Sequence, residues 1–193
     1  TLDDFENSYV RGHFGIDDLG FFAAAGRLAK RGLFNYAADL GFFKDARPAP
    51  LGYVSDRIEE MDGKGELEEE LAACEQRLGE YRQGLALFRA YEKVAKSGHD
   101  ELEAWILAAR NLVNRAEASR LLLMDRMGRG GPGVNAEALR ILEDLHALRR
   151  KTEAAVAATI KPSRTAEIMG WMYDSMEAAL GPAAARAGGS GGR

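Results

Sequence analysis

Apolar residues recur along most of the chain at the three- and four-residue spacing of an α-helix. The clearest case lies between about residues 65 and 96, where spacings of four and three alternate strictly through Leu67, Leu71, Cys74, Leu78, Tyr81, Leu85 and Phe88. That alternation places all of these side chains on one side of a helix. β-Branched residues are sparse, and no segment sustains the alternation of apolar and polar residues typical of a strand. The pattern therefore predicts an all-α fold.

Two more long helices are predicted after this one. The second begins at Asp100 and ends before the glycine-rich stretch 128–133, and its apolar positions are Leu102, Trp105, Ile106, Ala109, Leu112, Val113, Ala116 and Leu123. The third begins near Asn135 and carries Leu139, Leu142, Leu145 and Leu148. Three long amphipathic helices joined by short loops favour an antiparallel bundle. A coiled-coil dimer through the 67–88 seam is the alternative.

Shorter helices are predicted at both ends of this bundle. Thr1 and Asp4 form a capping-box signal for a first helix, and residues 1–62 hold several short helical patterns rich in phenylalanine and glycine. A last helix is expected to begin at Ser163 and to end at Gly181-Pro182. We therefore divide the chain into aromatic-rich short helices (1–62), a helical bundle (63–182) and a disordered, glycine-rich tail (183–193).

Charge and composition narrow the classes of partner. Lysine and arginine number 26 against 30 aspartates and glutamates, so the net charge is −4, and no basic stripe of the kind that binds nucleic acid is present. No apolar run approaches the roughly 20 residues that span a bilayer. Cys74 is the single cysteine, so no intrachain disulfide can form.

The reactive side chains form no recognisable catalytic, cofactor-binding or metal-binding pattern. His13, His99 and His146 are scattered, and Glu143 with His146 gives a single E-x-x-H where a di-iron bundle needs two. The 128–133 stretch, GRGGPG, lacks the G-K-[ST] ending of a phosphate loop. Cys74 occupies a core position, where we expect a small hydrophobic residue rather than a nucleophile.

Two longer stretches carry a family resemblance. They are TLDDFENSYVRGHFGIDD at the start and LRILEDLHALRRKTEAAVAATIKPSRTAEIMGWM near the end, through Asp4-Phe5, Phe14-Gly15, Leu145 to Arg149, and Pro162-Ser163. Both resemble the helical region that follows the catalytic barrel in glycoside hydrolases of the β-N-acetylhexosaminidase kind, family 20 and its relatives. The resemblance implies a non-catalytic region that buttresses a barrel lying before Thr1, in a carbohydrate-processing enzyme whose acidic catalytic pair belongs to the barrel.

This resemblance also names a partner and contact residues. The partner is the upstream catalytic domain of the same polypeptide, with carbohydrate reached through that domain. The aromatic residues expected at the sugar rim or at the interdomain contact are Phe14, Phe21, Phe22 and Trp171. For Trp171, packing in the core is the alternative.

Two other hypotheses stay open. A stand-alone helical interaction module predicts that residues 1–50 close their own core, whereas a barrel-buttressing region predicts a bare apolar patch on them. A metal or cofactor enzyme predicts buried carboxylates that converge with a histidine inside the bundle.

Overall fold

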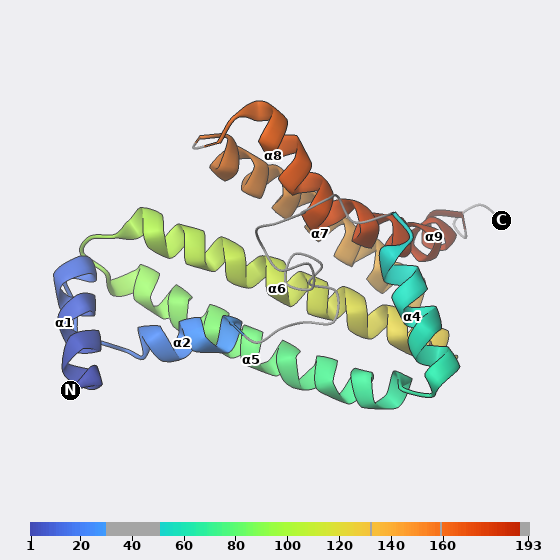
Figure 1. Cartoon of the computed structure of the whole chain (residues 1–193), viewed down its shortest axis with the longest axis horizontal. Helices are drawn as coiled ribbons and strands as arrows, with labels where there is room; N and C mark the ends of the chain where they lie inside the picture. Colours follow the sequence, from blue (N-terminus) through green and yellow to red (C-terminus); the bar gives the residue numbers. More distant parts are fainter. Residues whose placement is uncertain (30–50, 132, 159, 190–193) are drawn as a thin grey trace. The chain divides into compact units, whose positions relative to one another are not determined.

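The computed structural model describes residues 1–29, 51–131, 133–158 and 160–189, and within them it contains helices and no strand, which confirms the all-α prediction. The helices are α1 (Leu2–Phe14), α2 (Phe21–Leu28), α4 (Tyr53–Lys64), α5 (Leu67–Val94), α6 (His99–Arg126), α7 (Val134–Ala157), α8 (Pro162–Met169), the π-helix η1 (Gly170–Asp174) and α9 (Ser175–Gly189) (Figure 1). The three long helices are α5, α6 and α7.

The chain forms two compact units, and the helices α5 and α6 each contribute to both. Unit 1 combines the described residues of Thr1–Lys30 with Gln76–Val113, and unit 2 combines those of Arg31–Glu75 with Asn114–Arg193. The apolar seam of α5 is buried over its whole predicted length, from Leu67 to Phe88. Cys74 is buried within it, and its thiol donates a hydrogen bond to the Ala116 carbonyl at 3.3 Å, so the core prediction for this cysteine is confirmed.

In unit 1, α1 and α2 pack on the second half of α5 and the first half of α6. The capping box predicted at Thr1 and Asp4 is present, and α1 ends at Gly15, whose φ of 69° is left-handed. The rings of Phe88 in α5 and Trp105 in α6 stack with their centroids 5.3 Å apart. Because α5 and α6 are joined by the short 95–98 connection, this contact shows that the two helices run antiparallel.

One glycine of α5 permits the close approach of α2. A Cβ atom on Gly84 would lie 3.2 Å from the Ala24 carbonyl oxygen and 3.0 Å from a Leu28 methyl group, whereas a Cβ on Gly79 would meet nothing within 4 Å. The structure places a neighbour only at Gly84.

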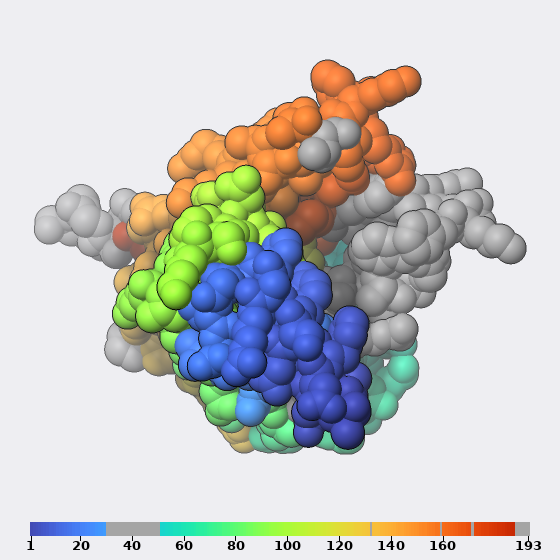
Figure 2. Space-filling model, turned by 90° about the vertical axis from the view of Figure 1, so that its left-hand side faces the viewer, coloured from blue at the N-terminus to red at the C-terminus, as the bar shows by residue number. Residues whose placement is uncertain are grey.

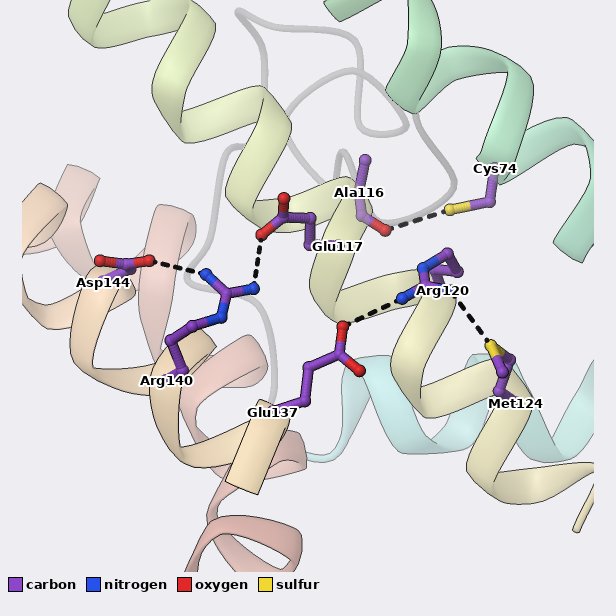
Figure 3. Close-up of polar contacts among 8 residues, drawn as sticks. All are labelled: Cys74, Ala116, Glu117, Arg120, Met124, Glu137, Arg140 and Asp144. Carbon is purple, nitrogen blue, oxygen red and sulfur yellow. Dashed lines mark hydrogen bonds and ion pairs between the residues drawn. The ribbon is translucent and has the colours of Figure 1, made fainter. Parts of the chain in front are cut away.

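In unit 2, the second half of α6 lies antiparallel to α7. The Asn114 amide donates to the Ile141 carbonyl at 3.1 Å. Arg120 donates to Glu137 at 3.0 Å, as Figure 3 shows. Arg140 adds hydrogen bonds of 3.1 Å to both Glu117 and Asp144, shown in the same close-up. The contacts that Asn114, Glu117 and Arg120 of α6 make with α7 fix the register of the helix pair.

The inward face of α7 differs by one position from the predicted stripe. Its buried residues are Ala138, Ile141, Leu145, Leu148 and Thr152, while Leu139 is 37% exposed. The stretch around Leu139 and Ile141 offers apolar residues on two neighbouring faces. Packing against α6 selects Ile141.

The C-terminal region also differs from the prediction. Instead of one helix that ends at Gly181-Pro182, the chain forms α8, η1 and α9, and α9 continues to Gly189 with Pro182 inside it. Leu180, Ala183 and Ala184 are buried on both sides of that proline, and α9 packs along α7. Burial of these side chains offsets the hydrogen bond that proline removes. Part of the expected disordered tail is therefore helical, and residues 190–193 lie outside the described residues.

Candidate functional site

A group of seven aromatic rings forms the centre of unit 1, and we call it the aromatic cluster. Its members are Tyr9, Phe14, Phe21, Phe22, Phe88, Tyr91 and Trp105. Phe21 lies in the middle, with its ring centroid 5.5 Å from that of Phe88, 5.7 Å from Tyr91 and 5.8 Å from Trp105. The edge-to-face angles, near 80°, are those that aromatic pairs prefer.

Two of the four aromatic residues that the sequence predicts at sugar or interdomain contacts are buried inside this cluster. Phe14 is 0% exposed and Phe21 is 3% exposed, so neither offers a surface to a ligand, in contrast to the expectation from the sequence. Phe22 is half-buried, with its ring 5.4 Å from Tyr9 and 6.3 Å from Phe5. The side chain of Trp171 lies outside the described residues. Sequence spacing could not reveal that α5 and α6 supply the rings covering Phe14 and Phe21.

The end of α1 is fastened to the α5–α6 connection. The Lys96 amide donates to the Phe14 carbonyl at 2.8 Å, and the Ser97 hydroxyl donates to the His13 carbonyl at 2.6 Å. Gly98 has a φ of 68° and lies against the same helix end: a Cβ there would be 2.6 Å from Phe14 Cδ1 and 2.9 Å from His13 Cδ2. The position of α1 within unit 1 is therefore defined by backbone contacts as well as by rings.

Three side chains converge on one carboxylate beside this junction. Glu101, in the first turn of α6, accepts hydrogen bonds from Tyr9 at 3.1 Å and from the Trp105 indole at 3.3 Å, and lies 2.6 Å from His13 Nε2. The rings of Tyr9 and His13 stack in parallel at 5.4 Å. Burial, with the hydrogen bond to Glu101, raises the pKa of Tyr9. No sequence signal joins His13 to Glu101, because the two are far apart in the chain.

Both carboxylate oxygens of Glu101 contact groups of unit 1, so these contacts anchor α1. The arrangement explains the orientation of α1.

The turn between α1 and α2 is held by a second anchor, the pair of Asp18 and Tyr91. The Tyr91 hydroxyl donates to Asp18 and accepts from the amides of Leu19, at 2.6 Å, and Phe21, at 3.0 Å. Asp18 also accepts from the amides of Gly20 and Phe21, both at 2.9 Å. The Asp18 carboxylate thereby accepts from two backbone amides at the start of α2.

This pair predicts a pH dependence of stability at both ends of the scale. Burial alone raises the pKa of Asp18, but the hydrogen bonds from Tyr91 and the backbone outweigh it and leave the pKa lowered. Asp18 therefore stabilises the folded state fully above about pH 4, the pKa of an aspartate in the unfolded chain. This stabilisation is lost as the pH falls through the lower pKa of the folded state. Burial and the Asp18 hydrogen bond raise the pKa of Tyr91 to about 12. Tyr91 therefore stabilises the folded state fully below about pH 10, and this stabilisation is lost as the pH rises towards 12.

The variant Tyr91→Phe measures this contribution. We expect a loss of about 1–3 kcal/mol in the free energy of unfolding at neutral pH, because Asp18 loses a donor and the Leu19 amide an acceptor. Urea unfolding at pH 3, 7 and 11 should show the difference between wild type and variant shrinking at both extremes. A difference that stays constant over this range would contradict the role of the pair.

The outer side of α1 is the most exposed apolar surface of unit 1. Leu2 is 70% exposed and Phe5 is 61% exposed, and Phe22 borders them through its contact with Phe5. We call Leu2, Phe5 and Phe22 the α1 outer face. Figure 2 shows α1, in blue, at the surface beside the yellow-green beginning of α6.

Unit 2 contains a different polar group, around the π-helix η1. The fully buried ring of Tyr173 lies 5.8 Å from the guanidinium carbons of both Arg115 and Arg149, and its hydroxyl donates to Thr152 at 2.8 Å. Arg149 pairs with Asp174 at 2.7 Å and with Glu177 at 2.9 Å. Hydrogen bonds to these two carboxylates outweigh burial and raise the pKa of Arg149.

Arg115 holds the π-helix itself. It donates to the Met172 carbonyl, and burial lowers the pKa of its guanidinium. A π-helix leaves carbonyl groups that a regular α-helix would satisfy differently, and a guanidinium is a suitable donor for one of them. The contacts of Arg115 with Met172 and Tyr173 join α6 to η1 within unit 2.

In the described part of the chain, no three histidine, cysteine, aspartate or glutamate side chains are placed to hold a metal ion. No helix in the same part is long and apolar enough to cross a membrane. Comparisons of the chain with models of known families, with curated proteins and with solved structures give no match. The α1 outer face is therefore the candidate contact surface of unit 1.

Proposed function

We propose that this chain is a non-catalytic helical module that binds another protein surface through the α1 outer face. The observation that supports the proposal is the contrast between the two sides of α1. Val10 and Phe14, on the inner side, are completely buried, whereas Leu2 and Phe5 project from the outer side. Residues 1–29 thus contribute to the core of unit 1 and still present adjacent apolar side chains outward.

The energy available at this face is appropriate for docking. Full burial of a leucine or phenylalanine side chain contributes about 1.5–3 kcal/mol. Single exposed apolar residues are ordinary on protein surfaces, but Leu2 and Phe5 are neighbours on α1, which is anchored at its other end, and Phe22 of α2 lies beside Phe5. A partner would therefore meet a preorganised surface and pay little ordering entropy.

A second candidate follows from the resemblance to β-N-acetylhexosaminidase-type glycoside hydrolases. In that proposal the partner is the catalytic barrel of the same polypeptide, and the chain buttresses it. The exposed Phe5 favours it, because Asp4-Phe5 is part of the stretch that carries the resemblance. The enclosure of Phe14 and Phe21 in unit 1 favours the more general interaction module.

Cross-linking in the source cell tests both candidates. A photoreactive benzoyl-phenylalanine in place of Phe5, in the full-length protein, should give an adduct whose peptides are identified by mass spectrometry. The same group at Glu153, an exposed position of α7 in unit 2, serves as the matched control. An adduct within a barrel on the same polypeptide would support the hydrolase candidate, and one with a different protein would support the general module. Equal yields at both positions, or no adduct at Phe5, would contradict the proposed function.

A further inference from the structure

We propose that the partner segment bound by the α1 outer face is an amphipathic helix whose apolar stripe is flanked by lysine or arginine. This inference rests on the proposed function and adds the chemistry of the partner. It follows from the arrangement of charge around Leu2 and Phe5.

The apolar side chains of the outer face form a narrow stripe. Successive residues of an α-helix are rotated by about 100°, so Leu2, Phe5 and Tyr9 fall within an arc of about 60°. The half-buried Tyr9 contacts Phe22 at 5.4 Å, which extends the stripe towards α2. Positions spaced by three and four residues are the anchors by which one helix packs along another.

Carboxylates lie on both sides of this stripe. By the same rotation, Asp4 falls on one side of Phe5 and Glu6 falls on the other side of Leu2, while Asp3 lies further round the helix, on the side of Val10 and Phe14. Asp3 and Asp4 are exposed, and Glu6 is half-buried. The first ten residues contain no lysine or arginine. Arg11, the first cation of α1, pairs with Asp17 at 2.8 Å.

Helix capping explains only part of this charge. Asp4 completes the capping box with Thr1, and acidic residues in the first turn stabilise the helix dipole. Glu6 lies in the second turn, and it has no hydrogen bond or ion pair among the described residues. Its charge is therefore available to a partner that approaches the stripe.

Charge complementarity selects among the possible occupants of the face. Two copies of this chain packed through α1 would bring carboxylates against carboxylates, which opposes association. A membrane with anionic headgroups would be repelled in the same way. A helix with lysine or arginine beside its apolar stripe matches both the apolar and the acidic parts of the surface.

A synthetic peptide pair provides a direct probe. The first peptide is a fluorescein-labelled amphipathic helix of about 18 residues with leucine at the stripe positions and lysine elsewhere, and the second has glutamate in place of lysine. We expect the whole chain to bind the lysine peptide at least about tenfold more tightly in fluorescence anisotropy. The preference should decrease when the salt concentration rises from ~50 to ~150 mM.

Three variants make the test specific. The double change Leu2→Ser and Phe5→Ser should weaken binding of the lysine peptide at least about tenfold. Glu6→Lys should reduce the preference for lysine over glutamate while leaving the fold unchanged by circular dichroism. The control combines Leu139→Ser and Glu153→Lys, exposed positions of unit 2, and should bind like the wild type.

Each result separates this inference from the proposed function. Equal binding of both peptides, or unchanged binding by the Leu2→Ser and Phe5→Ser variant, would overturn the inference. So would a dimer in sedimentation experiments that the same double change dissociates, because the occupant would then be a second copy. The proposed function is tested separately, by the cross-link from Phe5 to another protein, and none of these results affects that test.

Discussion

Replacement of Gly98 by alanine should lower the free energy of unfolding by about 2–5 kcal/mol. Two costs add at this position. Its φ of 68° is left-handed and unfavourable for any residue with a Cβ, and that Cβ would lie 2.6 Å from the Phe14 ring. Since Lys96 and Ser97 fix the adjacent backbone to the end of α1, the loop has little freedom to move away.

Gly128 provides a matched control for this experiment. Its φ is 69°, but a Cβ there would meet nothing within 4 Å. Gly128→Ala should therefore cost only the backbone term, about 1–2 kcal/mol. Urea unfolding of the two variants and the wild type separates the steric cost from the conformational one. Equal losses of unfolding free energy in the two variants would show that α1 does not pack closely against the 95–98 connection.

Truncation of Phe14 to alanine should cost about 3–5 kcal/mol, as is usual for a fully enclosed phenylalanine. The ring is in contact with Phe21 at 5.0 Å and with Tyr91 at 5.9 Å, and no part of it is exposed. Phe5→Ala on the same helix should change stability by only about 0.5 kcal/mol, because Phe5 is mostly exposed.

The comparison of these two variants distinguishes core from surface within one helix. Thermal and urea unfolding should both give the Phe14 variant a much lower stability than the Phe5 variant. If Phe14→Ala were as mild as Phe5→Ala, the enclosure of the aromatic cluster would be refuted. Phe14 would then again be a candidate for contacts with a neighbouring domain, as the sequence suggests.

The long helices could be predicted because their signal is local. The seam of α5 depends only on the spacing between Leu67 and Phe88, and every member of it is buried. Where two faces of one helix are both apolar, as at Leu139 and Ile141, spacing cannot choose between them and tertiary packing does. The same limit applies to Gly79 and Gly84, which differ only in whether α2 lies against them.

The anchors of unit 1 could not be predicted, since each joins residues that are remote in the chain. Tyr91 and Asp18 lie in different helical segments, and so do Glu101 and His13. Isolated histidines, tyrosines and acids are common in helical sequences, so nothing in the pattern pairs them. The exposure of Phe5 and the burial of Phe14 likewise depend on which side of α1 faces α5 and α6.

The π-helix has a consequence for how the C-terminal segment can change over evolution. A π-helix behaves as an α-helix with one inserted residue. Because η1 takes up its extra residue by local underwinding, loss of one residue between 170 and 174 would let this stretch close into a regular α-helix, with the later side chains near their present orientation. Loss of a residue between 175 and 179, in regular α-helix, would instead turn Leu180, Ala183 and Ala184 by about 100° around the helix axis and away from α7, so a deletion is tolerated better in η1 than in α9.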